Sequence, residues 1–239
     1  MWWAGNSGAD VYIGTRAAGV ARGEDVVVLA RVDGLAAALE LVAAKLESQS
    51  RRLRLRVWLS GGLCQPFMLP PLDGISAEGE RQKIALALAS RQTTLGDDCQ
   101  VWIDASSCSA ASLAVAIGRS TTETLLSGLS RNGRVISVRP WWAEVLRAGL
   151  ALRGPSLTTI GIQDCDSLTV LAGAGSKFEN AGVITPMSDD TASRAAWTRA
   201  LMAGDALMAG ACYARMDLDR RAESPFGGLK FGVATSIDP

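Results

Sequence analysis

The order in which strands and helices follow one another constrains the fold of this chain more than any other feature of its sequence. Residues 9–32 predict a strand at Val11–Ile13, a turn marked by Gly14 and Gly19, and a second strand over 25–32. Residues 34–48 then predict an amphipathic helix, with leucine and valine recurring at steps of three and four. The same order returns later, where residues 157–184 predict three strands before a helix over 191–202. Each half of the chain is therefore expected to open with an antiparallel hairpin.

This repetition predicts an α/β fold of two parts within the 239 residues. Gly154-Pro155 is the best candidate for a boundary, which gives a first subdomain over 1–153 and a second, reduced one over 154–239. Hairpins continued by helix–strand units fit two ribonuclease-H-like subdomains with mixed sheets flanked by helices, as in actin-like proteins. A single doubly wound parallel sheet is the alternative, but the early hairpins argue against it.

The composition excludes several kinds of function. The chain has no histidine, which removes Ser-His-Asp and Cys-His nucleophile pairs and imidazole metal sites. Its 24 basic and 24 acidic residues balance to a formal charge of zero, so no nucleic-acid footprint is expected. We expect no catalytic residues and no metal site, although a carboxylate- or metal-dependent enzyme stays open as a weaker alternative.

The cysteines and the apolar runs indicate a reducing compartment. The five cysteines are irregularly spaced and lack a C-x-x-C pair, so we expect reduced, structural thiols. No signal peptide is visible at the start, and no apolar run approaches the ~18 residues that span a bilayer. These features predict a cytoplasmic protein, which a partner could recruit to the inner membrane.

Three segments carry a resemblance to a known family. They are "LRVWLSGGLCQPFMLPPLDG" (55–74), "LLSGLSRNGRVISVRPWWAEVLRAG" (125–149) and "LTTIGIQDCDSLTVLAGAGSKFENAGVITP" (157–186). Their order of strands, glycines, prolines and helices resembles the PilM/GspL family of actin-like proteins. This resemblance implies a platform protein of a type IV pilus or type II secretion machine. It also implies a bitopic inner-membrane platform protein as partner, with a secretion or pilus motor ATPase as a second partner.

The resemblance directs attention to two turns, because actin-like ATPases hold nucleotide phosphates between two glycine-bearing hairpins that each carry an acid. The first turn keeps Gly14 and Thr15, but its nearest acid, Asp10, is expected to precede the strand. The second turn keeps Asp164 and Asp166 but lacks the glycine after the acid. Both depart from the pattern, so these four residues are interpreted as a vestigial site with neither ATP nor Mg²⁺ as a cofactor.

Two groups of side chains are candidates for partner binding. Trp141 and Trp142 are adjacent, and because neighbouring residues point in different directions we expect one indole to be exposed. Arg54 and Arg56 alternate along a predicted strand and would make one of its faces basic. The sequence thus predicts a non-catalytic scaffold of a pilus or secretion platform, with a nucleotide-binding actin-like protein as the alternative.

Overall fold

The structure is a computed structural model. It describes residues 8–23, 29–47, 53–75, 77–103, 110–154, 157–174, 177–185, 191, 195–196, 199, 211–216 and 234–237.

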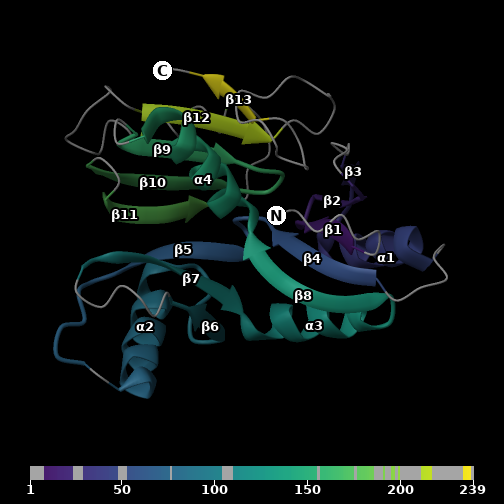
Figure 1. Cartoon of the computed structure of the whole chain (residues 1–239), viewed down its shortest axis with the longest axis horizontal. Helices are drawn as coiled ribbons and strands as arrows, with labels where there is room; N and C mark the ends of the chain where they lie inside the picture. Colours follow the sequence, from purple (N-terminus) through teal and green to yellow (C-terminus); the bar gives the residue numbers. More distant parts are fainter. Residues whose placement is uncertain are drawn as a thin grey trace.

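The first half is built on a mixed five-stranded sheet in the order β3-β2-β1-β4-β8 (Figure 1). Its strands are β1 (Gly8–Ile13), β2 (Ala17–Ala21), β3 (Ala30–Arg31), β4 (Leu53–Leu59) and β8 (Gly133–Pro140). The β1–β2 hairpin is antiparallel, whereas β4 and β8 run parallel to β1. The chain does open with a hairpin, but its second strand is β2, which lies where the sequence predicts a turn. The strand predicted over 25–32 is described only from residue 29 on, and there it contributes just the two residues of β3.

Two helices cover one face of this sheet. Helix α1 (Gly34–Glu47) follows the predicted apolar stripe, and α3 (Arg119–Ser130) lies beside it. Alternate residues of β4, from Leu53 to Leu59, point into the core beneath these helices. Helix α3 begins at Arg119, with Gly118 as its N-cap.

The chain segment between β4 and α3 forms a separate three-stranded sheet, which we call the inserted sheet. It consists of β5 (Cys64–Leu69), β7 (Ser112–Gly118) and β6 (Cys99–Trp102), in that spatial order, and α2 (Glu78–Gln92) packs against it. The strands themselves are predicted by the sequence, but their separation into a sheet of their own is not. Pro66 fits the position of β5 at an edge, where a strand can lack one donor.

The second half contains another five-stranded sheet, in the order β11-β10-β9-β12-β13. Its strands are β9 (Thr159–Gln163), β10 (Leu168–Ala174), β11 (Lys177–Ile184), β12 (Ala211–Met216) and β13 (Ala234–Ile237). Strands β9 to β11 form an antiparallel meander, and β12 joins β9 in parallel. The predicted opening of this half by three strands is confirmed.

Helix α4 (Trp141–Arg153) connects the two five-stranded sheets. It starts directly after Pro140 and ends at Gly154, whose φ of 55° suits a residue without a Cβ. The predicted boundary at 153/154 coincides with this end of the helix. One core cluster nevertheless joins both halves, because Tyr12, Trp141, Ile160 and Met216 belong to it.

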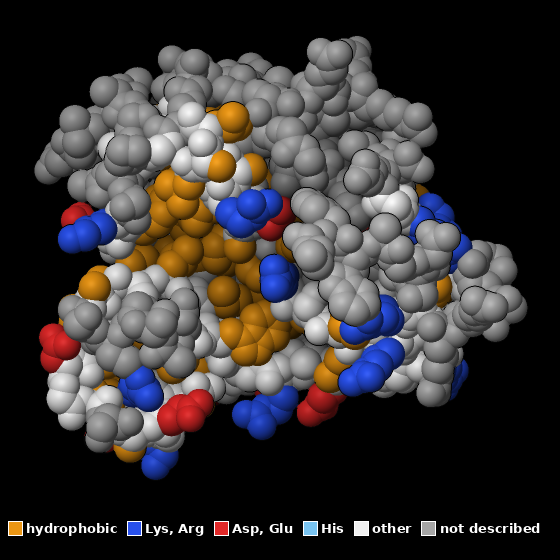
Figure 2. All heavy atoms as spheres, in the orientation of Figure 1, with side chains coloured by type: hydrophobic (Ala, Val, Ile, Leu, Met, Phe, Trp, Pro, Cys, Tyr) orange, Lys and Arg blue, Asp and Glu red, His pale blue; other side chains and the backbone are white. Residues whose placement is uncertain are grey.

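The face shown in Figure 2 is hollowed between the second sheet and the inserted sheet, and apolar side chains line the hollow. Partly buried apolar residues of β7 and β11 pack against the shared core here. Within the described ranges, no helix combines the length and the apolar character that crossing a bilayer requires.

Candidate functional site

Two turns from opposite halves of the chain meet at the centre of the molecule. The β1–β2 turn contributes Gly14 and Thr15, and the β9–β10 turn contributes residues 164–167. A third segment, Ser60-Gly61-Gly62, follows β4 and lies against the same place. We call this contact the turn junction. It brings together all four residues that the sequence assigned to a vestigial site.

Asp166 is the acceptor that joins the two halves. Its Oδ2 accepts hydrogen bonds from the Thr15 backbone N–H and the Thr15 hydroxyl, both at 2.7 Å, and from the Ser60 hydroxyl at 2.9 Å. The residue is only 3% exposed. One carboxylate oxygen of the second half therefore accepts hydrogen bonds from three donors of the first half.

Asp164 plays a similar part beside it. Its Oδ2 accepts from the Gly61 backbone N–H at 2.6 Å, while its Oδ1 accepts from the Ser167 backbone N–H at 3.0 Å and the Ser167 hydroxyl at 2.8 Å. Burial, and then the neighbouring Asp166 carboxylate, raise the pKa of Asp164 well above its usual range. The hydrogen bonds from Gly61 and Ser167 lower this pKa in part.

Close packing at the junction leaves no space for side chains at three glycines. A Cβ on Gly14 would lie 2.4 Å from the Cys165 Sγ, and one on Gly61 would lie 2.5 Å from the Thr169 Oγ1. A Cβ on Gly62 would lie 2.8 Å from the Asp166 Oδ1. The two halves therefore touch directly at this point, through backbone and small side chains.

Cys165 lies between the two aspartates. Its Sγ is 3.3 Å from the Tyr12 hydroxyl, and burial is the main cause that raises the pKa of both groups. The potential ligand atoms of Asp164, Cys165 and Asp166 lie within 4.8 Å of one another. The Asp166 Oδ1 is buried and has no hydrogen-bond partner in the structure.

Several solved structures are similar to this chain in fold. The cytoplasmic domain of EpsL, an inner-membrane component of the type II secretion system of Vibrio cholerae, aligns with a TM-score of 0.51 at 16% identity. The alignment covers 82% of this chain and 75% of that one. A Bacteroides thetaiotaomicron protein with an actin-like ATPase fold and unknown function aligns with a TM-score of 0.54 at 14% identity, over 83% and 76% of the two chains.

The chain has the actin-like fold.

A third similar structure is the PilM-PilN type IV pilus biogenesis complex, with a TM-score of 0.50, 12% identity and coverage of 75% and 61%. At the level of the fold, these neighbours confirm the resemblance seen in the sequence. No known family matches the sequence, and no curated protein matches it either.

The actin-like fold raises the question of whether the turn junction fits a nucleotide. Phosphate binding requires free backbone N–H groups at the turns, together with positive charge or a metal. Here the Thr15 and Gly61 N–H groups donate to Asp166 and Asp164. A phosphate would have to displace two buried carboxylates and would then lie beside them. The residues present do not fit a triphosphate.

Asp10 is placed differently from the prediction. It lies inside β1, is 2% exposed, and accepts from the Arg56 guanidinium at 2.6 Å and the Trp58 indole N–H at 3.2 Å. The parallel pairing of β1 with β4 sets Asp10 opposite Arg56, which explains the contact. Asp10 is therefore paired on the sheet and does not belong to the turn.

The prediction that one indole of Trp141-Trp142 would be exposed is wrong. Both are 1% exposed. Trp141 packs edge to face against Tyr12, with ring centroids 6.3 Å apart, and the Trp142 N–H donates to the Cys64 carbonyl at 2.8 Å. Both can be buried because α4 lies between two layers, which cover different faces of the helix. Neither offers a surface to a partner.

Arg54 and Arg56 lie on the face of β4 opposite to α1 and α3, as their alternation predicts. Arg56 forms an ion pair with Asp10. Both arginines are nevertheless exposed to solvent. Sequence reasoning missed Ser60 and Gly61, which it treated only as a turn. The signal available was a hydroxyl and two glycines directly after a buried parallel strand.

Proposed function

We propose that the chain is a non-catalytic cytoplasmic scaffold, a degenerate actin-like protein of a type IV pilus or type II secretion inner-membrane platform. The observation that carries this proposal is the position of Asp166. Its carboxylate accepts hydrogen bonds from the Thr15 N–H, the Thr15 hydroxyl and the Ser60 hydroxyl. An actin-like ATPase would need donors at this place to bind phosphate. The protein's own acid occupies the place of the anion, so the chain works without a cofactor.

The kind of machine is supported by the neighbours in structure. One is the cytoplasmic domain of an inner-membrane component of a secretion system, and another is a complex of two pilus biogenesis proteins. By analogy, the partner of this chain is a bitopic inner-membrane platform protein, and a motor ATPase is the second candidate. The genes beside this one offer a quick check, because a neighbourhood without pilus or secretion components would remove the main support for the assignment.

The alternative is a nucleotide-binding actin-like protein, and one observation favours it. The Asp166 Oδ1 lacks a partner, and the potential ligand atoms of residues 164–166 lie close enough together to hold a cation. A bound Mg²⁺ would compensate the charge of the two carboxylates and make an approaching phosphate less unfavourable.

Thermal unfolding with and without nucleotide separates the two functions. A ligand that binds only the native state at one hundred times its Kd stabilises it by about 2.7 kcal/mol, which for a chain of this size raises the Tm by roughly 5–10 °C. We expect about 5 mM MgATP to change the Tm by less than about 1 °C. Mg²⁺ alone serves as the control for cation binding. A clear rise with MgATP beyond that with Mg²⁺ would support the alternative.

A further inference from the structure

The outer edge of β8 is available for pairing. Strand β8 is the last in the order β3-β2-β1-β4-β8, and among the described residues no strand pairs with its outer side. An edge strand presents unpaired backbone N–H and C=O groups, to which an extended segment of another chain can add as a further strand.

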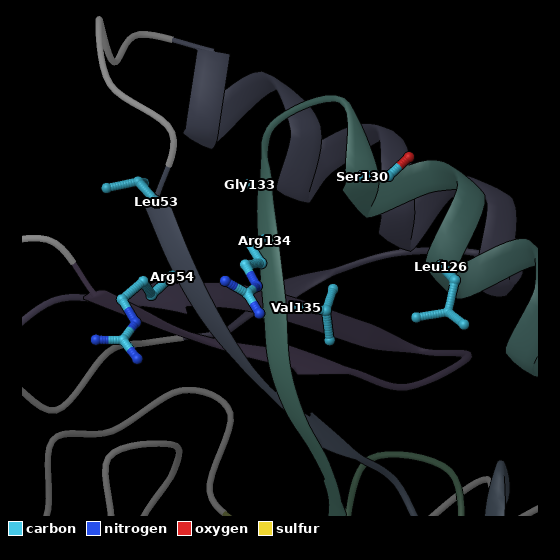
Figure 3. Close-up of a pocket in the computed structure, with 7 residues that line it drawn as sticks. All are labelled: Leu53, Arg54, Leu126, Ser130, Gly133, Arg134 and Val135. Carbon is cyan, nitrogen blue, oxygen red and sulfur yellow. The ribbon is translucent and has the colours of Figure 1, made fainter.

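A groove runs along the N-terminal end of this edge (Figure 3). It has a volume of about 560 Å³, within the range of ligand sites. Its lining comes from β4, α3 and β8 and consists of Leu53, Arg54, Leu126, Ser130, Gly133, Arg134 and Val135. We call it the β8 groove.

The two sides of the β8 groove differ in chemistry. In Figure 3, Arg54 and Arg134 lie on one side of β8, and Val135 and Leu126 lie on the other. Leu126 is 45% exposed, so its side chain is open to contact with a ligand in the groove. One side of the edge is therefore apolar and the other basic.

The basic side carries two neighbouring positive charges with no acidic partner among the residues that the structure describes. Arg54 and Arg134 are partners in the register of β4 and β8, and both are exposed. Arg131, at the end of α3, is also exposed. Within the described part of the chain, the lining contains no acidic residue. Two neighbouring guanidinium groups without a carboxylate attract an anion, and Arg binds carboxylates through paired hydrogen bonds.

The length of regular edge is limited. The register of β8 against β4 shifts between Leu55 and Arg56, which leaves Ile136 opposite no residue of β4 and 44% exposed. A bulge of this kind interrupts pairing on an edge strand. The regular stretch of edge next to the groove thus spans residues 133–135, because regular pairing resumes only at Ser137, and it suits a short segment.

We propose that the β8 groove binds an extended segment of a partner protein in which apolar and acidic side chains alternate, added as a strand to the outer edge of β8. Successive side chains of a strand point to opposite faces, so alternate residues would meet Leu126 and Val135 on one face and the two arginines on the other. A lipid surface or a nucleic acid would use the arginines alone and leave the apolar side unfilled. The inference rests on the proposed scaffold function, because it names the chemistry of the partner.

A short labelled peptide tests the groove. The probe is a fluorescein-labelled peptide of about ten residues with alternating leucine and glutamate between serine ends, at nanomolar concentration, and binding is followed by fluorescence anisotropy. A peptide of the same composition with leucines and glutamates in separate blocks is the first control. A leucine–lysine alternation is the second. We expect saturable binding of the alternating acidic peptide, at least tenfold tighter than of either control.

Variants locate the binding on the protein. Arg134→Glu, and separately Leu126→Asp, should each weaken binding of the acidic peptide at least tenfold. The matched controls are Arg91→Glu, an exposed arginine on α2, and Leu152→Asp, an exposed leucine on α4; both should stay within about twofold. Hydrogen exchange of the amides of residues 133–135 should slow when the peptide binds, as strand addition requires.

Three results would overturn the inference: no saturable binding, binding that Arg134→Glu and Leu126→Asp leave unchanged, or binding of anionic vesicles or oligonucleotides in place of the peptide.

Failure of the scaffold function is distinguishable from failure of the groove. If a platform protein binds the wild type and the groove variants equally, the groove is wrong and the scaffold stands. If the peptide binds as expected and MgATP raises the Tm, the groove stands and the cofactor-free function is wrong.

Discussion

The turn junction and the β8 groove both gather polar groups, but they leave those groups in opposite states. At the junction, the carboxylates of Asp164 and Asp166 are buried, and donors from the other half of the chain surround them. In the groove, Arg54 and Arg134 are exposed and face no acid within the lining. Buried polar groups with internal partners stabilise a fold, whereas exposed groups without them are free to recognise a ligand.

Under the proposed function, the turn junction is a structural contact and the surface carries the recognition of a partner. Each prediction below tests one side of the contrast, beginning with the largest expected effect.

Removing the Asp166 carboxylate should destabilise the protein most. Asp166→Ala leaves the Thr15 N–H and two hydroxyl groups without their acceptor, so we expect the free energy of unfolding to fall by about 3 kcal/mol. Urea denaturation measures it. The matched control is Asp98→Ala, at an exposed aspartate 3.9 Å from Arg119, where the change should stay within about 0.5 kcal/mol. Equal effects of the two substitutions would contradict a structural junction.

Filling the space at Gly14 should have the next largest effect. A Cβ at this position would meet the Cys165 Sγ at 2.4 Å, so Gly14→Ala should reduce the free energy of unfolding by about 1–3 kcal/mol. Gly79→Ala on α2 is the control, because a Cβ there meets nothing within 4 Å and alanine favours the helix. It should leave stability unchanged or raise it by up to about 1 kcal/mol. A tolerated Gly14→Ala would mean that the turns are not in close contact.

Stability should depend on pH through Asp164. Its pKa is raised in the folded protein, so its proton stabilises the fold in acid, and this contribution is lost as the pH rises through the raised pKa. Relative to Asp164→Asn, the wild type should lose stability above about pH 4, with a slope of at most about 1.4 kcal/mol per pH unit. Urea denaturation of both proteins from about pH 4 to pH 8 measures the difference. Parallel curves would show that Asp164 does not titrate as the junction requires.

Salt concentration should affect the β8 groove and the turn junction differently, and this is the smallest of the expected effects. Raising NaCl from about 50 mM to about 500 mM should weaken acidic-peptide binding to the β8 groove several-fold, because exposed charges are screened. The stability difference between the wild type and Asp166→Ala should change little over the same range, since buried groups are screened much less. Anisotropy and urea denaturation provide the two readouts. A salt-independent peptide affinity would argue against recognition by Arg54 and Arg134.

The sequence predicts the arrangement of strands better than the contacts between them. Local periodicity predicts the three strands that open the second half, and it places Leu53 to Leu59 with alternate residues in the core. In the first half it missed β2, a short run of alanine, glycine and valine. The inserted sheet could not be predicted, because periodicity identifies a strand but does not reveal its partner. The same limit applies to Asp10, whose pairing with Arg56 depends on the register between strands distant in sequence.

Four residues of the turn junction were singled out by the sequence, but Ser60, Gly61 and the geometry of the junction were not. Gly14, Thr15, Asp164 and Asp166 were chosen by resemblance, and the structure brings them together. The sequence could not show that an aspartate of one turn accepts hydrogen bonds from the other turn. The sequence of a turn does not reveal which segment lies opposite it in the fold. For Trp141 and Trp142 the reasoning considered a helix covered on one side, whereas α4 is covered on two.

A crystal structure grown with excess MgATP tests the central claim most directly, because it shows which group the Thr15 backbone N–H contacts. The account predicts that this N–H still donates to the Asp166 carboxylate, at a distance near the present 2.7 Å, with no nucleotide between the halves. A phosphate oxygen in place of that carboxylate, with the two turns moved apart, would contradict it.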